Sequence, residues 1–278
     1  MTAVLLALLT AAVYGVANYL GPLLGRRHAL GGVLLVGQAV GALGAVVLLA
    51  AEPAGAPDAR HLLLGIGAGA CNGVALASLY RASGAGPISI VAPIGSTGAV
   101  VPVAVAILGG ERPELLQLLG IPLAMVGVVL AAARDGASDQ QVRRSTVLLA
   151  LLAALTFGGF LTLFGRASDA GVPWAVLSSR VALVVCTGIV LAVARVPVRL
   201  PARAAAASAV PGLLLLCGTV AYATATTRGL LSVVSVIATL SPVVTVGLAV
   251  VLLGERLAAR QRLGVVTALV GVVLLAAG

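Results

Sequence analysis

The sequence predicts an all-α integral membrane protein whose ten transmembrane helices form two inverted five-helix repeats. Three observations predict this fold class. The 278 residues are 61% hydrophobic and 9% charged, with a mean hydropathy of +1.19, whereas soluble domains carry roughly 25% charged residues. The apolar residues fall into ten long runs, and one stretch of the chain occurs twice.

The repeated stretch defines the organisation of the chain. Residues 109–130 and 253–274 are identical at 12 of 22 positions without a gap, at a separation of 144. Each copy contains an apolar helix that ends in glycine, a Glu-Arg turn and a second apolar helix. A fixed internal period of this kind indicates two copies of one structural unit.

The ten apolar runs are the predicted membrane spans, because a spanning helix needs about 20 apolar residues. Their hydrophobicity is continuous rather than alternating, which excludes the strands of a β-barrel. The first run has no basic start and is longer than the roughly 7–15 residues of a signal-peptide core, so we expect it to be permanent. The predicted spans are 2–24, 31–51, 60–82, 87–109, 114–133, 145–166, 172–195, 205–228, 231–253 and 259–277.

Five spans belong to each copy, which gives a first repeat at 1–133, a linker at 134–144 and a second repeat at 145–278. Because five is odd, the second copy enters the membrane from the opposite side, and the repeat is inverted. A site is then expected at the interface of the two copies, near the middle of the membrane.

Small residues and prolines predict how the spans pack. Prolines in the fourth and ninth spans (Pro93, Pro102 and Pro242) each remove a backbone donor and can kink the helix. Such breaks lie beside the pathway in many transporters, but prolines also occur in ordinary membrane helices. Small residues at every fourth position allow close approach of two helices, and these are Gly37, Gly41 and Ala45 in the second span and Gly65, Gly69 and Gly73 in the third.

The charge pattern fits a membrane protein. All seventeen basic side chains are arginines, and sixteen flank apolar runs, so they meet lipid headgroups and no nucleic-acid partner is expected. Twelve of these sixteen fall on one face and four on the other, which predicts that both termini lie outside the cell. Cys71, Cys186 and Cys217 lie in different spans without metal-type spacing, so neither a metal nor a cofactor is expected.

Arg180 is the one charge deep within a span. It should face a cavity or a partner, because a charge at that depth is costly in lipid. All eight carboxylates lie in connections or at helix ends, so none can neutralise Arg180 or carry a proton through the membrane. A lone positive charge favours an anionic or zwitterionic ligand. The alternative is a structural arginine that bonds to backbone carbonyls at a helix break.

Polar side chains on helical faces complete the candidate substrate site. Tyr14 and Asn18 share a face of the first span, and Thr219, Tyr222 and Thr226 share one of the eighth. Ser and Thr also bond to their own helix backbone, which is the competing interpretation. The predicted substrate-binding residues are Arg180, Tyr14, Asn18, Asn72, Tyr222, Gln38, Ser96 and Thr239.

Glu111 and Glu255 recur in the two copies and invite a functional interpretation. Each precedes a helix, where a carboxylate meets unpaired N–H groups and the positive end of the helix dipole. We therefore expect both to cap the helices that follow them.

The two copies resemble the drug/metabolite transporter superfamily in its ten-helix form with two EamA-like domains. The residues that carry the resemblance are GPISIVAPIGSTGAVVPVAVAILGGER at 86–112 and GLLSVVSVIATLSPVVTVGLAVVLLGER at 229–256, each followed by a Gln and two Gly at matching positions (Gln117, Gly120 and Gly127; Gln261, Gly264 and Gly271). Arg180 also resembles the family's second-helix Arg, and Gln38 lies near the equivalent place in the first copy.

The resemblance implies a basket in which helices 1, 3, 4, 6, 8 and 9 surround a central cavity and helices 5 and 10 are peripheral. It also implies cytoplasmic termini, against the arginine count. Relatives export amino acids and other metabolites, exchange nucleotide sugars or phosphorylated sugars, or move lipid-linked sugars. Cation exporters of the superfamily depend on a Glu in the first helix, which this chain lacks.

The predicted function is a secondary transporter of the inner (plasma) membrane that exports small zwitterionic or anionic metabolites such as amino acids by alternating access. The alternative is a flippase for a lipid-linked sugar or a phospholipid; drug efflux and an intramembrane enzyme are less favoured. The expected partners are a small-molecule substrate and the lipid bilayer, and a homodimer is left open.

Overall fold

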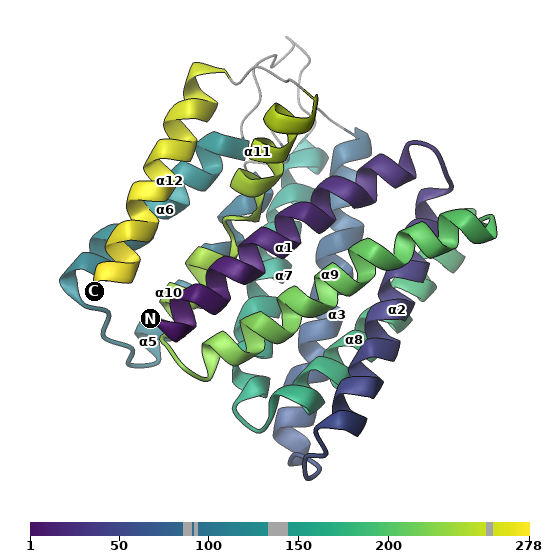
Figure 1. Ribbon diagram of the computed structural model, residues 1–278, viewed down its shortest axis with the longest axis horizontal. Coiled ribbons are helices and arrows are strands. Elements are labelled where there is room, and N and C mark those ends of the chain that lie inside the picture. The colour runs from purple at the N-terminus through teal and green to yellow at the C-terminus, as the bar shows by residue number, and fades with distance from the viewer. Residues whose placement is uncertain (86–90, 92–93, 133–143, 254–257) are drawn as a thin grey trace.

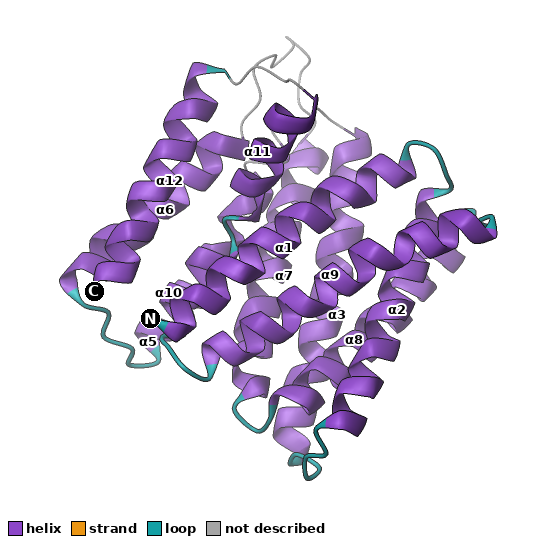
Figure 2. Ribbon diagram, viewed as in Figure 1, coloured by secondary structure: helices purple, strands orange, loops and turns teal. Residues whose placement is uncertain are grey.

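The computed structural model describes residues 1–85, 91, 94–132, 144–253 and 258–278, and these residues form helices and connections without strands (Figures 1 and 2). Nine stretches of the described chain are long and apolar enough to cross a membrane, and Ile94–Leu108 is a shorter apolar helix. The predicted all-α membrane fold is therefore confirmed.

The helices follow the predicted spans closely. In the first half they are α1 (Thr2–Gly25), α2 (Leu30–Ala51), α3 (Ala59–Ala85), the short 3₁₀ helix η1 (Thr97–Ala99), α5 (Val100–Leu108) and α6 (Leu115–Ala132). In the second half they are α7 (Arg144–Ser168), α8 (Val172–Val193), α9 (Ala202–Thr226), α10 (Leu231–Ala238), α11 (Ser241–Leu253) and α12 (Ala259–Ala277). Pro93, Glu255 and most of the predicted linker lie outside the described residues.

The predicted ninth span is present at Leu231–Leu252, and it consists of two helices that meet near the proline expected to kink it. Helix α10 ends at Ala238, and α11 begins at Ser241. Pro242 is the second residue of α11 and has no N–H to continue the α10 ladder. The fourth span is also irregular at the corresponding place, because η1 directly follows Ser96, which matches Thr239 between α10 and α11.

The helix contacts have the pairing that a two-fold relation between the copies requires. Exchanging the copies exchanges α1 with α7, α2 with α8 and α3 with α9. Helix α3 packs against α7 and α8, and α9 correspondingly packs against α1 and α2. Helices α6 and α12 pack mainly on each other at one side of the molecule (Figure 1). The exact boundaries of the two repeats stay a prediction.

Glycines allow the closest of these contacts, as the small-residue stripes predicted. A Cβ on Gly69 of α3 would lie 2.1 Å from the carbonyl oxygen of Ser179 in α8. A Cβ on Gly73 would lie 2.6 Å from Cβ of Cys186, about two turns further along α8. Helices α3 and α8 therefore approach to a distance that a larger side chain at either glycine would prevent.

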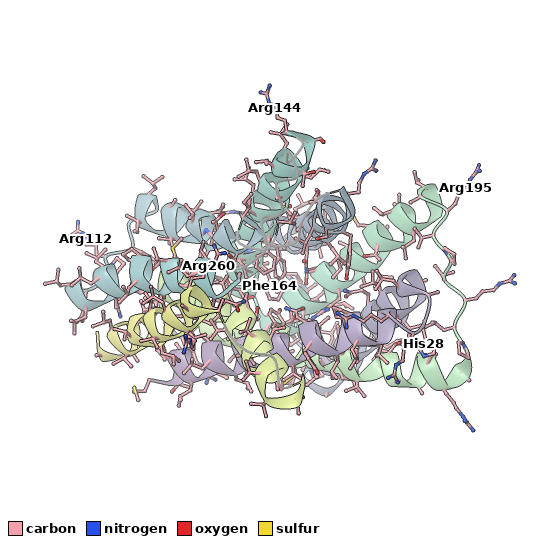
Figure 3. The ribbon with its side chains drawn as sticks, turned by 90° about the horizontal axis from the view of Figure 1, so that it is seen from above. His28, Arg112, Arg144, Phe164, Arg195 and Arg260 are labelled. Atoms are coloured by element: carbon pink, nitrogen blue, oxygen red, sulfur yellow. The ribbon has the colours of Figure 1, made fainter. Side chains whose placement is uncertain are left out.

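The two ends of the bundle differ in charge. Both termini lie at one end, which we call the terminus end: Gly229 packs against Ala3, and Gly278 against Gln117 (Figure 1). Figure 3 shows Arg112 at this end and His28 and Arg195 at the other. Successive helices run in opposite directions, so each connection can be assigned to one end. The five described carboxylates lie in connections at the terminus end, and nine described arginines lie at the opposite end, which we call the arginine-rich end. The orientation of these ends in the membrane stays a prediction.

Glu111 caps a helix, but not the one that follows it. Gly110 takes φ +100° after α5, a conformation that suits glycine, and Glu111 N–H donates to Ala106 O at 3.0 Å. This turn directs Glu111 across to the second repeat, where its carboxylate accepts bonds from the first residues of α10. The expectation that Glu111 caps α6 is therefore wrong, because its partners lie about 120 residues away.

Candidate functional site

Arg180 is the buried charge on which the candidate site is built. It is the ninth residue of the 22-residue helix α8, so at 1.5 Å per residue it lies about 12 Å from the helix start, well inside the span. Only 5% of the residue is exposed. A guanidinium at this depth costs at least about 2.5–3.5 kcal/mol on insertion scales, so it requires compensating partners.

Three neutral oxygens accept hydrogen bonds from Arg180. Its Nη1 donates to Gln38 Oε1 of α2 at 3.2 Å, and its Nη2 donates to the Leu215 carbonyl and the Thr219 hydroxyl of α9. These bonds use three of the five N–H groups of a guanidinium. In the described part of the chain no carboxylate bonds to Arg180. Its positive charge is thus solvated by the protein without being cancelled.

Thr219 connects Arg180 to the first helix. Its hydroxyl donates to Leu215 O, the carbonyl four residues earlier, at 2.6 Å, and its oxygen accepts from Arg180. The hydroxyl of Tyr14 lies 3.0 Å from Thr219 Oγ1. Since the Thr219 hydrogen is already directed to Leu215, Tyr14 is the donor. Helices from both halves therefore meet at one hydroxyl group.

Gln38 and Arg180 occupy the same position in two helices of equal length and bond to each other. Gln38 is the ninth residue of α2, and α2 and α8 both have 22 residues. The two residues are 142 positions apart and bond to each other. A two-fold relation between the copies would place its axis near this contact, and inverted repeats form their sites at such an interface.

A small cavity lies beside the network. It is lined by Asn72, Phe160, Ser179, Arg180, Leu183 and Thr219, and its volume is about 10 Å³. A cavity needs roughly 10–15 Å³ of this kind of volume to hold one water molecule, so a substrate could enter only if the walls moved apart. Its walls come from the third, sixth, seventh and eighth spans. The seventh span is thus part of the wall, although the resemblance did not place it there.

Some of the predicted site residues lie at the cavity or in the hydrogen-bond network of Arg180, and the others lie away from it. Tyr14, Gln38 and Asn72 lie with Arg180 at the cavity or in its hydrogen-bond network. Asn18 lies one helical turn beyond Tyr14 on α1 and is exposed. It does not line the cavity.

Tyr222 lies in the protein core. It is fully buried, donates to Leu161 O at 3.0 Å and lies 2.7 Å from Ser235 Oγ of α10. Its ring stacks on Phe164 at a centroid distance of 6.1 Å. Tyr222 therefore joins α7, α9 and α10 one turn away from Thr219, without lining the cavity.

Ser96 and Thr239 mark the irregular turns of the fourth and ninth spans. Thr239 follows the last residue of α10, and its hydroxyl donates to Val236 O at 2.8 Å. Ser96 precedes η1. Neither residue lines the described cavity.

Four cavity residues were not among the predicted site residues: Thr219, Ser179, Leu183 and Phe160. Thr219 belongs to the polar stripe on the eighth span, but the stripe alone does not say which of its members faces Arg180. Ser179 precedes Arg180 and shares its wall. Phe160 belongs to the aromatic series Phe157, Phe160 and Phe164, whose spacing along α7 was visible in the sequence.

A comparison with protein families identifies the second half of the chain. The model of the EamA-like transporter family matches residues 144–277. Residues 144–277 belong to the EamA-like transporter family. The chain thus fits the drug/metabolite transporter superfamily, as the repeated motifs suggested, and this family implies a multi-span membrane transporter.

Comparison with solved structures extends the fold beyond the EamA-like domain. One crystal structure superposes with a TM-score of 0.80 over 98% of this chain and 95% of its own, at 14% sequence identity. Identity at this level shows a shared fold only. No curated protein matches the chain.

Proposed function

We propose that this EamA-like protein is a secondary transporter of the inner membrane that exports small zwitterionic or anionic metabolites, such as amino acids, by alternating access around the Arg180 cavity. The observation that carries the proposal is the buried charge of Arg180, which only neutral oxygens solvate. A negatively charged group of the substrate would supply the missing counter-ion.

The remaining donors of Arg180 suit such a ligand. Two of its five N–H groups have no acceptor among the described residues. A carboxylate or phosphate in the cavity could accept both, and hydrogen bonds between charged groups are about twice as strong as neutral ones. Phe160 and Leu183 offer an apolar wall for the rest of the ligand, and these walls would have to move apart to admit it.

The test is thermal stability of the purified protein in detergent against amino acids, organic anions, cationic dyes and lipid headgroup analogues. A ligand at 100 times its Kd stabilises by about 2.7 kcal/mol. We expect one anionic or zwitterionic class to stabilise the wild type and Arg180→Ala to lose the response. Arg203→Ala, an exposed arginine in α9, is the matched control and should respond as the wild type does.

Gln38→Glu tests the charge argument without removing Arg180. The substitution keeps the side-chain size and places a carboxylate about 3.2 Å from Arg180 Nη1. Two opposite unit charges at this distance attract by about 5 kcal/mol at an effective dielectric of 20, so the guanidinium would be neutralised internally. We expect the anion response to fall at least tenfold while the folded protein persists. An unchanged anion response in both variants would reject the proposal, and a response to headgroup analogues alone would favour a flippase.

A further inference from the structure

Glu111 forms a charged bond between the two repeats at the terminus end. Its Oε1 accepts from Leu231 N–H at 2.8 Å, and its Oε2 accepts from Ser232 N–H at 3.1 Å and from the Ser232 hydroxyl at 2.7 Å. Glu111 belongs to the α5–α6 connection of the first repeat, whereas Leu231 and Ser232 begin α10 in the second. The bond thus crosses between the halves that alternating access would move.

Helix α10 depends on this carboxylate. The first N–H groups of a helix have no partner within it, and the residue before α10, Leu230, has no side chain that can accept them. Glu111 supplies both the acceptor oxygens and a negative charge at the positive end of the helix dipole. Residues Ser232–Ala238 are all buried, so water cannot readily replace the cap.

The neighbourhood of the cap is closely packed. A Cβ on Gly229 would lie 2.7 Å from Ala3 at the start of α1, and a Cβ on Gly165 would lie 2.7 Å from Leu231. At the end of α5, a Cβ on Gly109 would lie 3.5 Å from Arg166 Nη2 of α7. Elements of both repeats therefore lie in close contact near the start of α10.

Polar contacts also lead from the cap toward the cavity. Ser235 lies one turn after Ser232 on α10 and bonds to Tyr222 of α9. Thr219, one turn before Tyr222, bonds to Arg180. The helix that Glu111 caps is thereby joined to the helix that holds the buried charge.

We propose that Glu111 is a positioning residue that holds the terminus end closed by capping α10, and that release of this cap opens the cavity toward that end. The inference rests on the alternating-access part of the proposed function, because a bond between the repeats at one end must break when that end opens. It does not depend on the substrate.

The experiment measures from which side the cavity is accessible. Ser179→Cys puts a thiol of similar size in the cavity wall, in a background where Cys71, Cys186 and Cys217 are replaced by Ala. A small membrane-impermeant thiosulfonate is added to either side of sealed vesicles. Gly55→Cys identifies the terminus side, because Gly55 lies in the α2–α3 connection with nothing within 4 Å of a Cβ.

We expect Glu111→Ala to raise the labelling rate of Ser179→Cys from the terminus side at least tenfold and to lower the rate from the arginine-rich side. Glu111→Gln, which keeps the size and one acceptor oxygen, and Ser232→Ala, which removes one donor, should give smaller changes in the same direction. Glu114→Ala is the matched control, because Glu114 is an exposed carboxylate in the same connection. It should change neither rate.

Two outcomes would overturn the proposal. Equal increases from both sides would mean that Glu111 only stabilises the fold, and unchanged rates would mean that the cap does not control access. If Glu111→Ala does not fold, the milder Glu111→Gln and Ser232→Ala decide between these outcomes. If the labelling rates shift toward the terminus side but no ligand stabilises the protein, Glu111 keeps its proposed role and the metabolite proposal is rejected. If a ligand stabilises the protein in an Arg180-dependent way but the labelling rates do not shift, the metabolite proposal stands and the role of Glu111 is rejected.

Discussion

Gly69→Ala should loosen the contact between α3 and α8 that supports the cavity wall. The added Cβ would lie 2.1 Å from the carbonyl oxygen of Ser179 and 2.7 Å from Cβ of Ala182. The first distance is about 1.3 Å short of the 3.4 Å at which ordinary contact begins. Because the obstacle is backbone, no side-chain rotation relieves it, and the two helices must separate.

Overpacking of this kind costs about 1–3 kcal/mol, and we expect Gly69→Ala to lower the free energy of unfolding by about 2 kcal/mol. The matched control is Gly67→Ala on the same helix, where the nearest atom to a Cβ is Leu163 Cδ1 at 3.5 Å. That change should be neutral or slightly stabilising, because Ala is the better helix former by up to about 1 kcal/mol.

The assay is unfolding in mixed detergent micelles, followed by the fluorescence of Trp174. This is the only tryptophan of the chain, and it lies on α8 with its Nε1 bonded to Ala54 O at 3.0 Å. The separation should also displace Ser179 and Arg180, so the ligand response should weaken in Gly69→Ala and not in Gly67→Ala. Equal stabilities for the two variants would refute the packing argument.

Three further predictions concern residues away from the cavity. Tyr222→Phe should cost about 1 kcal/mol of stability, because two buried hydrogen bonds are lost, yet leave the ligand response intact; calorimetry with and without ligand checks both. The pKa of the Asp58 carboxyl is lowered by hydrogen bonds from the backbone and the ring of His61. The ionised Asp58 therefore stabilises the folded protein fully at pH values above the pKa of the unfolded state. This stabilisation is lost as the pH falls through the lower pKa of the folded state. Asp58→Asn should remove that acid dependence from a pH series of melting temperatures. Arg195 has φ 52°, a conformation that costs most residues about 1–2 kcal/mol, so Arg195→Gly should raise the melting temperature, whereas Arg199→Gly in the same connection should not.

The membrane spans could be predicted because they follow from composition alone. Each needs only enough consecutive apolar residues, and the helix ends agree with the predicted ends to within a few residues over most of the chain. The break of the ninth span could not be placed in this way. Pro242 indicated that the helix could kink there. Whether a proline bends a helix or divides it is decided by the packing around α10.

The buried position of Arg180 could be predicted from the sequence, but the residues that surround it could be predicted much less well. Arg180 was identifiable because a lone charge in an apolar run has few explanations. Thr219 and Tyr222 lie one turn apart on the same helix, yet Thr219 meets Arg180 while Tyr222 bonds to Ser235. That difference depends on how α9 is rotated against its neighbours, which one sequence does not determine. The cap that Glu111 forms on α10 joins residues about 120 positions apart and has no local signal.

The contact between Gln38 and Arg180 gives a physical reason for having one arginine rather than two. Each residue is the ninth of a 22-residue helix, and the two bond to each other at 3.2 Å. An arginine at position 38 would place two guanidinium groups at about that distance, with a repulsion of about 5 kcal/mol at an effective dielectric of 20. Two arginines at these positions would therefore require a counter-ion, whereas the neutral Gln38 accepts a hydrogen bond from the single charge. The difference between the two positions leaves the positive charge of Arg180 without a counter-ion among the described residues.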